Sequence, residues 1–253
     1  MDQTYYQTYL MLEERNWWFR ARKGILLSLL ESRVFCGRKP LQILDVGCGP
    51  SALYVRALQE AGHDIAGIDF SDQSIGMARK KGAKKVYNMS MESFFAYEKE
   101  PRDIILMLDV LEHVQNDLEL VQSAFENIRE AGTLFITVPA YQCLWGPHDE
   151  VNHHFRRYTK RKLVAIVSGA GFQVEKASYF NTLLFPLALV KKFADKFQGG
   201  GKKDFNDRSS GVINRVFTWI FEVEKYFLSW MSFPYGLSIL VIAHKAKAQP
   251  KNG

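Results

Sequence analysis

A short glycine loop and a later acidic residue are the first features of this chain whose types and spacing indicate chemistry. Gly47-Cys48-Gly49 directly follows the apolar run 41–46, and Asp69 closes the next apolar run, twenty residues beyond Gly49. Glycines let the backbone turn sharply and approach a ligand at the carboxyl end of a strand. A carboxylate after the second strand can accept hydrogen bonds from two ribose hydroxyls. The spacing therefore indicates a nucleoside-binding site.

The same loop is compatible with a dinucleotide, because Ala52 completes a Gly-x-Gly-x-x-Ala pattern. Two neighbours argue against that alternative. Asp45 precedes the loop and Pro50 follows it, whereas a pyrophosphate needs free backbone amides and no facing anion. A nucleoside without phosphates, such as S-adenosylmethionine, is favoured, and an NAD-dependent oxidoreductase stays the alternative.

The elements around the loop alternate between strands and helices. Apolar runs predict strands at 41–46, 64–69, 84–87, 103–108, 133–138, 172–179 and 237–243. Helical spacing occupies 51–61, 71–81 and 116–129. This order predicts a doubly wound α/β domain, whose parallel strands need crossovers and are buried on both faces.

Three motifs at successive strand ends carry a resemblance to a known family. They are Ile-Leu-Asp-Val-Gly-Cys-Gly at 43–49, Gly-Ile-Asp-Phe-Ser at 67–71 and Leu-Asp-Val-Leu-Glu-His-Val at 108–114. Together they resemble class I S-adenosylmethionine-dependent methyltransferases, and the third is most like the branch of the ubiquinone-biosynthesis O-methyltransferases. The resemblance covers roughly residues 41–178 and the final strand.

The resemblance implies a fold and a cofactor site. The fold is a Rossmann-like methyltransferase fold, with a mostly parallel seven-stranded sheet, N-terminal helices and a helical insertion before the last strand. Gly47 and Gly49 would line the methionine and ribose portion of S-adenosylmethionine, Asp69 would hold the ribose hydroxyls, and Phe70 would lie against the adenine. The remaining cofactor candidates are Asp45, Cys48, Ser90, Met91, Asp109 and Arg20. Cys48 is also explained as a small filler between the glycines.

A histidine-rich segment follows the fifth predicted strand and supplies the catalytic candidates. Residues 145–158 hold three of the six histidines. Methylating a hydroxyl requires the acceptor to lose its proton, and histidine suits that role near neutral pH. The candidate catalytic residues are His154, His148, Asp149 and Tyr158. Their spacing fits no recognised zinc pattern, so we predict a site without metal. Arg156 and Arg157 could bind an anionic acceptor or form structural ion pairs.

Composition restricts the remaining classes of function. The 253 residues are 47% hydrophobic and 24% charged, which excludes a disordered chain. The three cysteines are too scattered for a disulfide framework. Neither a secretory signal nor a membrane-spanning run is present, so we expect a cytoplasmic protein. The Asn-Pro-Pro-Tyr motif of amino-methylating DNA enzymes is missing, and no nucleic acid partner is expected. Nothing indicates the oligomeric state.

The positive charge and a second apolar pattern fall together near the C-terminus. Residues 191–253 carry 11 Lys and Arg against 5 Asp and Glu, whereas 1–190 carry 22 of each. The spacing of Ile213, Val216, Ile220, Val223, Phe227 and Met231 predicts one apolar helical stripe.

We therefore predict an N-terminal helical cap at 1–38, a methyltransferase domain at 39–180 plus 236–246, and a helical insertion at 181–235. The insertion is interpreted as a lid or as a surface for the inner membrane face. The expected activity is methyl transfer to oxygen of a small-molecule or lipid-linked acceptor. A catalytically silent binding protein is the remaining alternative.

Overall fold

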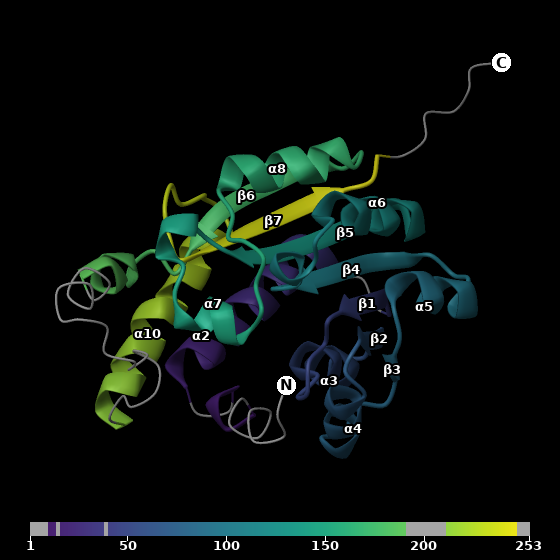
Figure 1. Ribbon diagram of the computed structural model, residues 1–253, viewed down its shortest axis with the longest axis horizontal. Coiled ribbons are helices and arrows are strands. Elements are labelled where there is room, and N and C mark those ends of the chain that lie inside the picture. The colour runs from purple at the N-terminus through teal and green to yellow at the C-terminus, as the bar shows by residue number, and fades with distance from the viewer. Residues whose placement is uncertain (1–9, 14–15, 38–39, 191–210, 247–253) are drawn as a thin grey trace. The chain divides into compact units, whose positions relative to one another are not determined.

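The computed structural model describes residues 10–13, 16–37, 40–190 and 211–246, and these form two compact units (Figure 1). Unit 1 contains 1–37, 139–159 and 178–239, and unit 2 contains 38–138, 160–177 and 240–253. No helix in the described part of the chain is long and apolar enough to cross a membrane.

Seven strands form one mixed sheet in the order β3-β2-β1-β4-β5-β7-β6. The strands are β1 (Gln42–Val46), β2 (Asp64–Asp69), β3 (Val86–Asn88), β4 (Arg102–Leu108), β5 (Ile128–Pro139), β6 (Gln173–Phe180) and β7 (Ser238–His244). The pairings among β1 to β5 are parallel. β7 runs against β5, because Ala131 N–H donates to the Lys245 carbonyl and Ala140 N–H to the Leu237 carbonyl. The predicted seven-stranded, mostly parallel sheet is confirmed.

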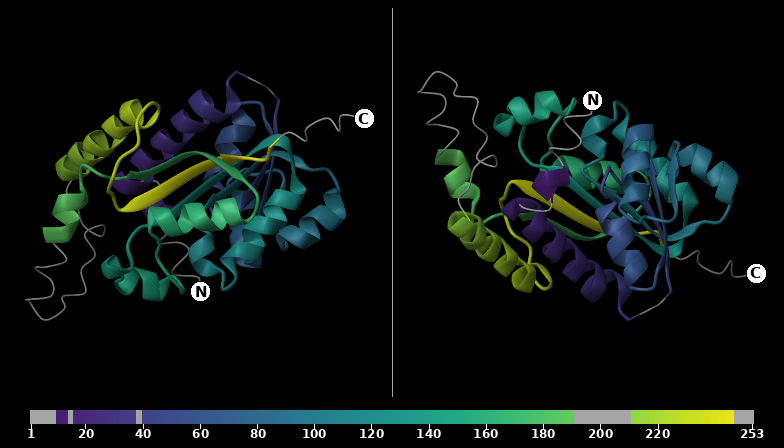
Figure 2. Two further views of the ribbon diagram at one scale, coloured as in Figure 1. Left: turned by 90° about the horizontal axis from the view of Figure 1, so that it is seen from above. Right: turned by 90° about the horizontal axis from the view of Figure 1, so that it is seen from below.

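Helices cover the parallel strands of unit 2. They are α3 (Leu53–Glu60), α4 (Asp72–Lys80), α5 (Met91–Glu98), α6 (Asp117–Asn127) and α8 (Lys160–Gly169). α6 packs against α5 and α8, and these three lie along one face of the sheet (Figure 2). Ser71 caps α4 and Asn116 caps α6 through their side-chain oxygens. Coverage on both faces explains why Ile43 and Leu44 of β1 are fully buried.

Two elements of unit 2 differ from the sequence prediction. α5 was not predicted, because its eight residues mix apolar and charged side chains without a clear period. β5 begins at Ile128, inside the stretch predicted as helix up to 129. Its pairing with β4 is irregular between Arg102 and Ile104, and Ala131 adopts a left-handed φ of 59°. This irregularity hides the start of the strand from an alternation test.

Unit 1 is built on two helices, α2 (Trp17–Leu29) and α10 (Gly211–Leu228), which pack against each other. The Asn16 side chain caps α2 by accepting from the Trp18 N–H, so α2 begins directly after it. Trp17 lies edge-on against Phe217 and Phe221 of α10. The predicted boundaries of the cap and insertion stay predictions, although α2 and α10 share one unit.

The buried face of α10 matches the predicted stripe only in part. The fully buried apolar residues of the helix, Phe221 and Leu228, lie outside the stripe. Of the stripe itself, Ile220, Val223 and Met231 are half-buried, and Val216 and Phe227 are exposed. The side chain of Ile213 lies outside the described part. α10 carries apolar residues on two sides, so periodicity alone could not find the most buried one.

Replacing Phe221 with Ala should lower the free energy of unfolding by about 3–5 kcal/mol, because its buried ring leaves a cavity beside Trp17. Urea denaturation followed by circular dichroism measures this loss. The matched change Trp219→Ala, on the exposed side of the same helix, should alter stability by less than about 0.5 kcal/mol. Equal losses for both variants would contradict the assigned buried face.

Candidate active site

The glycine loop of unit 2 lies against the end of β2. The N–H groups of Gly47 and Cys48 donate to the Ile68 carbonyl at 2.8 and 3.0 Å. Gly47 and Gly49 have φ values of 71° and 67°, in the left-handed region that favours glycine. A Cβ on Gly47 would also lie 2.9 Å from a Val110 methyl group. Both glycines are therefore required by the backbone path.

Cys48 fills the space beneath this loop. A Cβ added to Gly67 of β2 would lie 2.9 Å from the Cys48 sulfur, so the missing side chain at Gly67 makes room for the thiol. Burial raises the pKa of Cys48 far above its ordinary value, and Asp45 and Asp69 raise it further. The thiol is neutral at physiological pH, which fits packing rather than nucleophilic attack.

The Asp69 carboxylate ties the loop to β2. One oxygen accepts from the Gly49 N–H at 3.0 Å and the other from the Ser71 N–H at 2.8 Å. Burial raises the pKa of Asp69, and the two backbone donors act in the opposite direction. Each carboxylate oxygen keeps a further lone pair that can accept from a hydroxyl.

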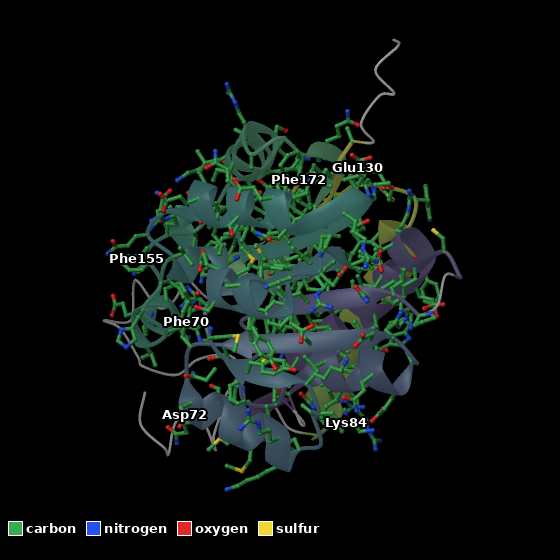
Figure 3. The ribbon with its side chains drawn as sticks, turned by 90° about the vertical axis from the view of Figure 1, so that its right-hand side faces the viewer. Phe70, Asp72, Lys84, Glu130, Phe155 and Phe172 are labelled. Carbon is green, nitrogen blue, oxygen red and sulfur yellow. The ribbon has the colours of Figure 1, made fainter. Side chains whose placement is uncertain are left out.

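A cavity of about 480 Å³ opens beside Asp69, entirely within unit 2. Its lining includes residues of α6 together with Val46, Gly47, Ile68, Asp69, Phe70, Met89 and Met91. The cavity lies beside β1, and the strand order reverses between β1 and β4. Open α/β sheets usually bind their ligands at such a reversal. The Phe70 ring, labelled in Figure 3, is 81% exposed.

Six of the ten predicted cofactor residues do not line this cavity, namely Asp45, Cys48, Gly49, Ser90, Asp109 and Arg20. Asp45 is buried in β1. Ser90 caps α5, accepting from the Ser93 N–H. Asp109 follows β4 with a left-handed φ of 58° and accepts from the Thr137 hydroxyl at 3.0 Å. Their predicted contacts with the cofactor stay predictions.

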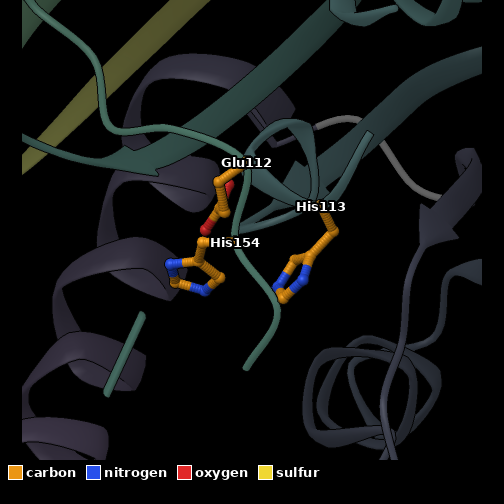
Figure 4. Close-up of side chains that lie close together, drawn as sticks. All are labelled: Glu112, His113 and His154. Carbon is orange, nitrogen blue, oxygen red and sulfur yellow. The ribbon is translucent and has the colours of Figure 1, made fainter. Parts of the chain in front are cut away.

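Other lining residues were missed by sequence reasoning. Val110, Val114, Asn116 and Glu119 follow β4 and open α6. The signal that could have found them is their place just beyond a strand end, where parallel sheets bind ligands. Between them lies the short helix η2 (Leu111–His113), in which Glu112 is fully buried and His113 exposed (Figure 4).

In unit 1, the predicted catalytic segment surrounds one buried carboxylate. Asp149, in α7 (Pro147–Val151), is fully buried. It accepts from His154 Nδ1 at 2.8 Å, from Arg157 Nε and Nη2 at 2.7 and 2.9 Å, and from the Gly146 N–H at 2.8 Å. Burial raises the pKa of Asp149, but the hydrogen bonds from His154 and Arg157 outweigh it and hold the pKa well below its ordinary value.

The other predicted residues of unit 1 stand in different positions. His148 is exposed, lies edge-on to the His154 ring, and contacts the Asn152 amide. Tyr158 is fully buried, which makes its ring part of the core of unit 1. Arg20 is exposed on α2. Their catalytic or binding roles stay predictions.

Comparison with known proteins decides the family. A family model described as a methyltransferase domain matches residues 18–177. The chain belongs to this family. The loop, Asp69 and the cavity of unit 2 are thus those of a methyltransferase domain, and S-adenosylmethionine is its cofactor.

The similar curated proteins share only part of their length with this chain. Ubiquinone biosynthesis O-methyltransferase of Azoarcus sp. is 29% identical over 107 residues, 40% of this chain and 46% of that protein. The protein of the same name from Aromatoleum aromaticum is 29% identical over 122 residues, 46% and 47% of the two chains. The chain spans about half the length of these relatives.

Solved structures share the fold. A S-adenosylmethionine-dependent methyltransferase from Archaeoglobus fulgidus aligns with a TM-score of 0.55 and 18% identity, covering 94% of this chain and 99% of that one. The plantazolicin methyltransferase BpumL, in complex with S-adenosylhomocysteine, aligns with a TM-score of 0.63 and 14% identity, covering 97% and 91%. The Rossmann-like methyltransferase fold is confirmed, and the dinucleotide alternative loses its support.

The residues of unit 2 fit the cofactor. The cavity volume lies within the roughly 300–1,000 Å³ that small-molecule sites occupy. Asp69 offers lone pairs to the ribose hydroxyls, and the exposed Phe70 ring offers an apolar face for the adenine.

Replacing Asp69 with Ala should weaken binding of S-adenosylhomocysteine by roughly 1.5–3 kcal/mol for each charged hydrogen bond lost. Isothermal titration calorimetry measures this change. Asp72→Ala, an exposed carboxylate three residues later in α4, is the matched control and should leave the affinity unchanged. An unaltered affinity in the Asp69 variant would reject the ribose assignment.

Asp149 should make stability depend on acid pH. Its pKa is lower in the folded state than in the unfolded chain, so its stabilisation is complete above about pH 3.9 and is lost as pH falls below that value. The free energy of unfolding can be measured in urea from about pH 5 to about pH 3, a range that spans the pKa of Asp in the unfolded chain. Over this range it should fall more steeply for the parent than for Asp149→Asn. Parallel profiles would contradict the buried ion pair.

Proposed function

We propose that this protein transfers a methyl group from S-adenosylmethionine to an oxygen atom of a small-molecule or lipid-linked acceptor, with His154 as the general base. The observation that carries the proposal is the 2.8 Å contact between His154 Nδ1 and the buried Asp149 carboxylate. The cofactor site belongs to unit 2, and His154 belongs to unit 1.

The Asp149 carboxylate sets the tautomer of the neutral His154 ring. An ionised carboxylate only accepts hydrogen bonds, so the hydrogen of the neutral imidazole lies on Nδ1 and the lone pair on Nε2. Nε2 then takes the proton of the acceptor hydroxyl as the oxygen attacks. Asp149 faces the imidazolium that forms and stabilises its charge.

Arg157 keeps that carboxylate in place. Its guanidinium binds both Asp149 oxygens through Nε and Nη2, a two-point contact that fixes the carboxylate plane. Because Arg157 already shares the negative charge, the main effect of Asp149 on His154 is orientation of the ring.

S-adenosylmethionine supplies an electrophilic methyl group on a sulfonium sulfur. Asp69 and the glycine loop hold the nucleoside so that this group has one position relative to unit 2, and catalysis consists largely of alignment together with removal of one proton. The name of the O-methyltransferase relatives supports oxygen as the nucleophile. Contact with the inner membrane face belongs to the same proposal, since a lipid-linked acceptor would be found there.

Methyl transfer is tested with labelled S-adenosylmethionine and two probes, an organic-solvent extract and an aqueous extract of cells. Label should enter a product of one extract, and chemical analysis of that product should find an O-methyl group. Label in neither extract, with intact binding of S-adenosylhomocysteine, would favour a catalytically silent binding protein.

With the labelled product as assay, His154→Ala should lower kcat by roughly 10²–10⁴ and leave S-adenosylhomocysteine affinity nearly intact. His153→Asn is the matched control, because His153 is exposed and has a φ of 55°, which asparagine tolerates. His148→Ala shows whether its neighbour shares the role. Parental turnover in both the His154 and His148 variants would make the cluster structural.

A further inference from the structure

α10 presents an apolar side opposite the one that packs on α2. This side consists of Val212, Val216, Trp219 and Tyr226, at spacings of four, three and seven residues, and Trp230 follows just beyond the end of α10. Their exposed fractions are 72%, 46%, 68%, 65% and 68%, in that order. Single exposed apolar residues are ordinary on protein surfaces, but a continuous row of this length marks an interaction surface.

A second exposed row continues this surface on the preceding segment. Residues 185–190 are helical, and Leu183, Leu187 and Val190 are exposed at 49%, 40% and 66%. This segment lies close to α10 in all three views of Figures 1 and 2. Leu184 and Phe185 turn the other way, and Phe185 contacts the rings of Tyr141 and Tyr235.

Glu224 of α10 fastens the two rows together. Its buried carboxylate accepts the N–H groups of Asn181, Thr182 and Leu183 at 2.7, 2.6 and 2.8 Å. Three backbone bonds to one carboxylate fix where the 183–190 segment leaves β6, relative to α10. The segment is thus tied to α10 at its start, and the two exposed rows together are here called the exposed apolar face.

Composition and charge indicate which partner this face fits. Trp and Tyr combine an apolar ring with a polar tip, the character that places them at the boundary between lipid headgroups and acyl chains. The chain that joins the two rows, 191–210, carries six Lys and Arg against three Asp. This net positive charge adjoins both rows in the sequence, and it favours an anionic surface as the partner.

We propose that the exposed apolar face docks on the surface of an anionic lipid bilayer, with Trp219 and Trp230 entering the headgroup boundary. The same charge argues against a second copy of the chain as the occupant, because two copies would bring like charges together. The described helices are too short or too polar to span a membrane, so the contact is peripheral. The docking does not depend on methyl transfer, but it rests on the proposed function for its purpose, which is to reach a lipid-linked acceptor.

Co-sedimentation of the full-length protein with vesicles tests the proposal directly. Phosphatidylcholine vesicles with and without phosphatidylglycerol are compared at equal total lipid and at low and high salt. The protein should bind the vesicles that contain phosphatidylglycerol, and higher salt should weaken binding because it screens the lysine and arginine charges. Failure to bind these vesicles at low salt would overturn the proposal without affecting the methyltransferase assignment.

The double variant W219S/W230S should reduce vesicle binding at least about tenfold, because it removes both indole rings from the face. Tyr97→Ser is the matched control: Tyr97 is also 68% exposed but lies on α5 in unit 2, and its loss should not change vesicle binding. S-adenosylhomocysteine titration verifies that each variant retains a folded unit 2. Equal vesicle binding by W219S/W230S and the parent would overturn the assignment of the face. A second result would also overturn it: the parent binds no vesicles and is a dimer, and W219S/W230S is a monomer.

Discussion

The hydrogen bond from the Gly49 N–H to the Asp69 carboxylate is the contact on which the cofactor site depends. The loop lies on β2 where Gly67 has no side chain and the Cys48 thiol takes the space. A Cβ at Gly67 would lie 2.7 Å from a Val55 methyl group and 2.9 Å from Cys48, so either the loop or α3 would have to shift. In the proposed site the nucleoside would meet a carboxylate whose orientation is already set, which would lower the entropy lost on binding.

A buried carboxylate plays the corresponding part in unit 1. Asp149 lies in the interior, where an isolated charge would be prohibitively expensive, and it is tolerated because His154, Arg157 and Gly146 all donate to it. Removing one donor would leave the others facing a partly paired charge. The same bonds that make the burial tolerable also give the imidazole one orientation, so structural and chemical roles cannot be separated here.

Much of the fold could be predicted because parallel strands are continuous apolar runs: the strand at 64–69 was predicted to the residue. The glycine loop and Asp69 followed from the same logic, since strand ends share one edge. The orientation of α10 could not be predicted, because apolar residues on two sides make its period ambiguous. Among the acids of 145–158, only the folded chain shows that Asp149 is the one fully buried and bound by four donors.

The central claim, that Asp69 holds the ribose of the cofactor, is tested most directly by changing the ligand and leaving the protein intact. Calorimetry would compare S-adenosylhomocysteine with its analogue lacking both ribose hydroxyls. The account predicts that the analogue binds at least about tenfold more weakly, equivalent to ~1.4 kcal/mol. Equal affinity for the two ligands would contradict it, because Asp69 would then make no contact with the ribose.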